Sequence, residues 1–139
     1  AFTPRVPLYI QAGRLRVGGI VADRLPVVFT WETTSTPLVL TAGMADSAGL
    51  TVEDDSPRAV VTIDGRQLVA AQIVVPRIRM GACVAQKVPA LVLPPECEDL
   101  GARIDETALR PCQAVVERER LRLVIQPGTS RESNEPDDP

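Results

Sequence analysis

The feature that most limits the fold of this chain is a series of short aliphatic and β-branched runs separated by turn residues. The clearest pair covers residues 59–63 and 66–75, which are joined by Asp64-Gly65. Asp-Gly between two such runs predicts a β-hairpin, because both turn residues tolerate a positive φ. Thirteen prolines and nine glycines argue against long helices. The sequence therefore predicts an all-β domain of many short strands.

The composition predicts one domain with an aliphatic core. Apolar residues make up 45% of the 139 residues and aromatic residues only 3%, so Val, Leu, Ile and Ala must form the core. Residues 127–139 contain no apolar side chain, and such a segment cannot repay the entropy cost of ordering. We expect a folded domain over residues 1–126 and a disordered acidic and polar tail over 127–139.

The remaining elements follow from periodicity and from turn residues. Strands are expected at residues 6–10, 15–21, 27–31, 38–41, 87–93, 115–116 and 121–125, in addition to the hairpin. Ala12-Gly13 is expected to be a turn. Residues 42–48 are compatible with two helical turns ended by Gly49. Residues 102–109 have a helical composition, so the chain is expected to carry one or two short helices.

The segment 26–50 holds the most informative pattern. An apolar run (Val27, Val28, Phe29 and Trp31) leads into the polar loop Glu32-Thr33-Thr34-Ser35-Thr36. Leu38-Val39-Leu40 follows at once, and a segment of small residues then closes at Gly49-Leu50. The pattern predicts a strand, a tight loop carrying an acid, a second strand and a helical turn.

In this order the elements resemble the retropepsin-like aspartic proteases, in particular the bacterial single-lobe members, over residues 5–126. The first signature of that family, apolar residues followed by Asp-Thr-Gly-Ala-Ser, aligns without a gap on residues 29–36. Val39-Leu40 and Gly49-Leu50 match its later parts. The hairpin with Asp64-Gly65 at its tip takes the place of the family's flap. Residues 87–93 are similar to the strand before the second signature, which Leu100-Gly101 and residues 102–109 match weakly.

The resemblance implies a closed, barrel-like sheet and a homodimer. In this family each lobe supplies one aspartate, and the two carboxyl groups share a proton while they activate a water molecule. A single lobe supplies one carboxyl group, so activity requires a second copy of the chain.

This sequence departs from the family pattern at two catalytic positions. Glu32 replaces the aspartate, and its extra methylene exceeds the positional tolerance of about half an ångström for catalytic groups. Thr34 replaces a glycine whose backbone conformation a β-branched residue resists. Thr33 matches the threonine that ties the two loops together, and Thr36 stands where it can hydrogen-bond Glu32.

These departures predict a non-catalytic, protease-like domain that binds a peptide or a protein partner. Strand addition between loop and flap is the expected mode, with Thr36, Asp64 and Gly65 as binding residues. The alternative is an active aspartic-type endopeptidase that works as a homodimer with Glu32 in place of aspartate. A third possibility is an unrelated β-barrel binding domain in which Glu32 lies in an ordinary solvated turn. Residues 46–50 also resemble a motif of PilZ-type receptors, but the paired upstream arginines of those receptors are missing.

Other classes of function find little support in the sequence. The chain has no histidine, which removes histidine-dependent nucleophilic mechanisms and most zinc sites. We expect no metal and no cofactor. The net charge of −3 and the lack of a basic face predict no binding to nucleic acid. No apolar run reaches membrane-spanning length. Cys83, Cys97 and Cys112 are expected to be thiols, or Cys97 and Cys112 to pair if the chain is exported.

Overall fold

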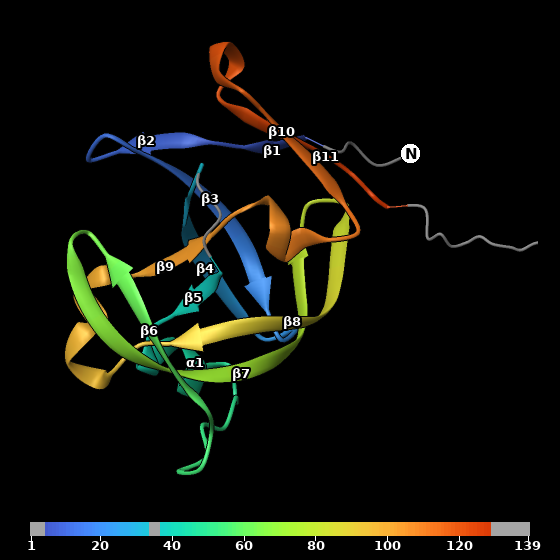
Figure 1. Cartoon of the computed structure of the whole chain (residues 1–139). Coiled ribbons are helices and arrows are strands. Elements are labelled where there is room, and N and C mark those ends of the chain that lie inside the picture. Colours follow the sequence, from blue (N-terminus) through green and yellow to red (C-terminus); the bar gives the residue numbers. More distant parts are fainter. Residues whose placement is uncertain (1–4, 34–36, 129–139) are drawn as a thin grey trace, which may run out of the picture.

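The structure is a computed structural model, and it describes residues 5–33 and 37–128 (Figure 1). Most of these residues lie in strands, which confirms the all-β prediction. The strands are β1 (Arg5–Pro7), β2 (Tyr9–Gln11), β3 (Arg14–Val21), β4 (Leu25–Trp31), β5 (Leu38–Leu40), β6 (Arg58–Ile63), β7 (Arg66–Met80), β8 (Cys83–Val92), β9 (Ala102–Ile104), β10 (Gln113–Glu117) and β11 (Arg122–Gln126). The helical elements are α1 (Ala42–Ser47) and the 3₁₀ helices η1 (Pro95–Leu100), η2 (Glu106–Leu109) and η3 (Arg118–Arg120).

The strands form one large sheet and one small sheet. The large sheet has the order β2-β3-β4-β9-β5-β8-β7-β6, and it curls so that β3 also pairs with β7. The small sheet has the order β1-β11-β10 and joins the two ends of the described chain. In Figure 1 the small sheet lies at the top of the view, while the long β6–β7 hairpin curves around the lower left. The additional pairing of β3 with β7 closes the large sheet on itself, as in a barrel.

Strand β9 is inserted between β4 and β5. It runs parallel to β4, where Thr30 is opposite Arg103 and Trp31 is opposite Ile104. It runs antiparallel to β5, where Val39 is opposite Arg103. The insertion places a segment from late in the chain directly beside the end of β4, where the polar loop begins.

The β6–β7 hairpin has the predicted turn. Ile63 pairs with Arg66, and the two residues between them have positive φ values of 50° at Asp64 and 79° at Gly65. Both φ values belong to the left-handed region, which Asp and Gly adopt more readily than β-branched residues do. The hairpin prediction is therefore confirmed at its tip, and β7 continues beyond the predicted end to Met80.

Helix α1 follows β5 and matches the prediction for residues 42–48 within one residue. The side chain of Thr41 accepts a hydrogen bond of 3.2 Å from the Met44 N–H group and so caps the helix. Gly49 ends the helix with a φ of 76°. Among the described residues, no helix is long and apolar enough to cross a membrane.

Aliphatic side chains fill the core, as the composition predicts. The largest buried side chains come from many different strands, and Phe29 is the one fully buried aromatic residue among residues 5–33 and 37–128. Full burial of one such side chain stabilises a fold by about 1.5–3 kcal/mol. The fully buried large residues include Phe29, Leu38, Leu40, Ile78, Met80, Leu93, Ile104, Leu109, Leu123 and Ile125.

Two predictions about local structure are wrong. Residues 102–109 do not form a helix, because Ala102–Ile104 is buried between β4 and β5 as strand β9. Tertiary strand pairing overrides the helical composition there, and only Glu106–Leu109 forms a short 3₁₀ helix. The expected strand at 6–10 is broken at Leu8, whose side chain is buried and whose N–H group donates to the Leu121 carbonyl oxygen at 2.8 Å.

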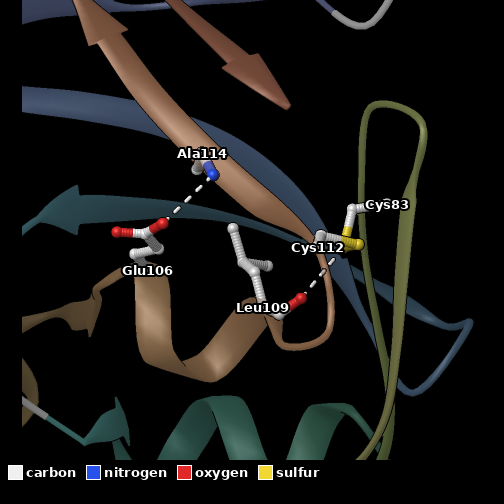
Figure 2. The surroundings of a disulfide bond; sticks show 5 residues. All are labelled: Cys83, Glu106, Leu109, Cys112 and Ala114. Atoms are coloured by element: carbon white, nitrogen blue, oxygen red, sulfur yellow. Dashed lines mark hydrogen bonds between the residues drawn. A yellow bond between two sulfur atoms is a disulfide. The ribbon is translucent and has the colours of Figure 1, made fainter. Parts of the chain in front are cut away.

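The cysteine pairing also differs from the prediction. Cys83, at the start of β8, forms a disulfide with Cys112, just before β10 (Figure 2). Cys97 is free and buried among Val39, Ile63 and Leu93. Cys97 and Cys112 are closer in sequence, but the fold places the β7–β8 turn rather than η1 next to Cys112. The Leu109 carbonyl oxygen lies 3.4 Å from the Cys83 sulfur, a contact in which the disulfide sulfur carries no proton to donate.

Candidate functional site

Glu32 lies at the end of β4, in the first position of the polar loop. Its backbone N–H group donates a hydrogen bond of 2.9 Å to the Ile104 carbonyl oxygen at the end of β9. The buried strand β4 ends here, because the charged residue Glu32 follows the buried Trp31. The pairing of β4 with β9 therefore fixes the backbone from which the Glu32 carboxylate projects.

The carboxylate of Glu32 is bound by Arg103. The Arg103 Nη1 atom lies 2.9 Å from Glu32 Oε2, and the arginine side chain is only 7% exposed while the glutamate side chain is 22% exposed. Arg103 stands in the middle of β9, opposite both Thr30 and Val39. A buried guanidinium needs ionic and hydrogen-bonding partners, and Glu32 is one of them.

The second partner of Arg103 is Asp64 at the tip of the β6–β7 hairpin. Arg103 Nη2 donates to Asp64 Oδ2 at 2.9 Å, and Arg14 Nη2 donates to Asp64 Oδ1 at 2.7 Å. The hydrogen bond from Arg14, followed by that from Arg103, holds the pKa of the Asp64 carboxyl below its usual value. The hydrogen bond to Asp64 in turn raises the pKa of Arg14. Four charged groups thus connect the hairpin tip to the polar loop.

The other predicted site residues are only partly gathered here. Thr33 is exposed and lines a hollow of about 380 Å³ together with Trp31, Glu32 and Glu106. Gly65 is exposed at the hairpin tip beside Asp64. Thr34 and Thr36 lie outside the described residues, so the predicted hydrogen bond between Thr36 and Glu32 stays a prediction.

Sequence reasoning missed the arginines of this site. Arg103 interrupts the apolar run Leu100-Gly101-Ala102-Arg103-Ile104, and a lone charge in such a run was a usable signal of a buried ion pair. Arg14 gave no comparable signal, because it stands at the start of an ordinary strand. Within residues 5–33 and 37–128, no group of three or more acidic or cysteine side chains is arranged to hold a metal ion.

Comparison with known proteins agrees with the predicted family and with the all-β fold. The family model described as "Aspartyl protease" matches residues 14–106, which include both Glu32 and the hairpin. A solved structure, a retropepsin-like aspartic protease from Rickettsia conorii, superposes with a TM-score of 0.66. That match has 15% sequence identity and covers 86% of this chain and 88% of the other, so it shows the fold alone.

No curated protein sequence matches the chain. The matched family model spans well over half of the residues, and the solved structure shares the fold. Together they exclude the alternative of an unrelated β-barrel domain. The chain is therefore a member of the aspartyl protease family, with the retropepsin-like fold.

Proposed function

We propose that this domain is a non-catalytic member of the aspartyl protease family that binds an extended peptide segment of a partner. The observation that carries the proposal is the ion pair between Arg103 and Glu32, the residue that the sequence resemblance aligns with the catalytic acid of the family. The hairpin tip, the family's flap, is bound to the same arginine through Asp64.

An arginine at this place is at odds with the chemistry of an acid dyad. In such a dyad two carboxyl groups lie against each other, share one proton and polarise a water molecule between them. In this chain Glu32 Oε2 already accepts a charge-assisted hydrogen bond from Arg103 at 2.9 Å. That hydrogen bond competes with a water molecule for the oxygen and offsets the negative charge that would polarise it.

A peptide-binding role is supported by the surface beside the flap. Strand β6 is the edge of the large sheet, and within the described residues it pairs with β7 alone, so its outer backbone groups are open to a further strand. A groove of about 770 Å³ lies next to it. The groove is lined mainly by apolar residues, including Pro37, Val60, Ile73, Val74, Pro89 and Leu91.

A homodimer is part of the proposal, because one chain of this family forms one lobe. Glu32, Thr33 and the hollow beside them are on the surface of the single chain, where a second copy can cover them. The predicted absence of a nucleic-acid partner also stays a proposal and rests on the net charge of −3.

The test is cleavage of a peptide library between about pH 4 and 7, with the wild type compared with Glu32→Gln. We expect no cleavage by either protein, while hydrogen exchange shows that bound peptides protect the backbone of β6. Cleavage that disappears in Glu32→Gln would instead establish the active peptidase with a glutamate dyad. Sedimentation of the same samples measures the oligomeric state.

A further inference from the structure

We propose that Arg14, Arg16 and Arg103 form a carboxylate-binding site under the flap, and that Asp64 occupies this site when no ligand is present. The inference rests on the proposed peptide-binding function and names the chemistry of its ligand. The ligand is a peptide that presents a carboxylate, from an acidic side chain or from its C-terminus, in place of Asp64.

The three arginines lie on β3 and β9, on one face of the neighbouring strands β3, β4 and β9. Arg16 on β3 is opposite Thr30 on β4, and Thr30 is opposite Arg103 on β9. Arg14 is two residues before Arg16 on the same strand, so both side chains project from the same face. Arg14 and Arg103 both reach Asp64, which places this face directly beneath the tip of the flap.

The hydrogen-bond donors of this cluster exceed its acceptors. Three guanidinium groups face two carboxylates, those of Glu32 and Asp64, among the described residues at this face. The Nε atoms of Arg16 and Arg103 are buried, and neither has a hydrogen-bond partner in the described part of the chain. The Nη1 atom of Arg16 donates a long hydrogen bond of 3.3 Å to the Thr30 hydroxyl oxygen. A guanidinium offers five donors in a fixed fork that matches a carboxylate, so a ligand carboxylate in the place of Asp64 can use donors that Asp64 leaves unpaired.

Asp64 is suited to be displaced from the cluster. Its side chain is 38% exposed, and Arg14 is 41% exposed, so water and salt screen this part of the network. Asp64 lies at a two-residue hairpin tip on the edge strand pair of the sheet. A ligand carboxylate can make the same hydrogen bonds, and the peptide that carries it can also pair with the free edge of β6.

The test uses small carboxylates, so that it does not depend on the identity of the peptide. N-acetylglutamate α-methylamide carries only a side-chain carboxylate, N-acetylvaline carries only a C-terminal carboxylate, and N-acetylglutamine methylamide carries neither. Each is titrated into the Asp64→Asn variant, the Asp99→Asn variant and the wild type. The arginine Nε–H resonances are followed by NMR, with those of Arg16 identified in Arg16→Gln.

In Asp64→Asn we expect saturable shifts of the Arg16 and Arg103 resonances with one or both acids. The affinity should be about tenfold weaker in the wild type and in Asp99→Asn, because Asp64 still competes there. The acid that binds with the higher affinity shows whether the site prefers a side-chain carboxylate or a C-terminal carboxylate. Absence of saturable shifts in Asp64→Asn, or equal shifts with the neutral amide, overturns the inference.

Two further points keep the outcome clear. Asparagine tolerates the positive φ at position 64, and Asp64→Gly serves the same purpose if the first variant does not fold. Peptide binding at β6 is measured separately by hydrogen exchange. If the small carboxylates cause no saturable shift of the arginine resonances while peptides still bind at β6, this inference alone is refuted. If no peptide binds at β6, the proposed function is refuted.

Discussion

Arg103 donates its hydrogen bond to Glu32 from a position 71 residues later in the chain, and the two meet only because β9 lies beside β4. The arginine is nearly as buried as a core residue, whereas the glutamate is partly open to solvent. Arg103 is paired with Glu32 at 2.9 Å and with Asp64 at the same distance. The pairing of Arg103 with Glu32 gives the clearest test of how this site is held together.

We predict that Glu32→Gln destabilises the fold by about 1–3 kcal/mol, because the buried Arg103 is left with Asp64 as its ionic partner. Arg103→Met should cost less than about 1.5 kcal/mol, because an unbranched apolar side chain fills the space and removes the buried charge. In a double-mutant cycle the two changes should couple by about 1–2 kcal/mol. Urea unfolding measures all four proteins. Arg79→Met, which removes an exposed pair with Asp23, is the control, and additive effects of the two main changes would contradict the ion pair.

The flap should loosen at acidic pH. The pKa of Asp64 is lower in the folded protein than in the unfolded chain because of Arg14 and then Arg103. The ion pairs of Asp64 therefore stabilise the hairpin tip at pH values above the pKa of about 4 that Asp has in the unfolded chain. This contribution is lost as the pH falls through the lower pKa of Asp64 in the folded protein. Hydrogen exchange at the hairpin tip, corrected for intrinsic rates, should accelerate in that range. Asp64→Asn should show no such step, and an equal step in this variant would assign the effect to another group.

Breaking the disulfide should destabilise the domain. Cys83 and Cys112 are separated by 29 residues, and closing a loop of this order stabilises a fold by about 2–4 kcal/mol. The double variant Cys83→Ser/Cys112→Ser should lose this amount in denaturant unfolding, and reducing agent should then have no further effect. Wild-type protein should show one thiol that reacts only after unfolding, because Cys97 is buried. Three reactive thiols in the oxidised protein would refute the bond.

Two adjacent glycines on β3 should respond differently to alanine. A Cβ atom at Gly19 would lie 3.1 Å from the Arg79 carbonyl oxygen and 3.1 Å from the Phe29 ring, whereas at Gly18 nothing lies within 4 Å. Gly19→Ala should therefore cost about 1–3 kcal/mol through overpacking where β3 meets β7. Gly18→Ala should be neutral or slightly stabilising, because alanine lowers the entropy of the unfolded chain. Thermal unfolding compares the two variants, and equal midpoints would show that β3 does not approach β7 this closely.

Local chemistry made much of this fold predictable. Asp64-Gly65 specified a hairpin because both residues accept a positive φ, and Gly49 ended α1 for the same reason. Alternating aliphatic runs specified strands, and the order of the elements with the Glu32 loop indicated the family that the comparisons show. In each case the residues that predict the structure are close together in the sequence.

The amino-acid sequence by itself determined the all-β class, the hairpin, the helix after β5 and the presence of an acid in the loop after β4. Tertiary structure alone decided that Ala102–Ile104 is a strand, since its neighbours β4 and β5 come from a distant part of the chain. It also decided that Cys83 rather than Cys97 reaches Cys112, and that Arg103 meets both Glu32 and Asp64. The physical reason is the same for all three: burial and pairing depend on which distant strands become neighbours, and no local pattern encodes that choice.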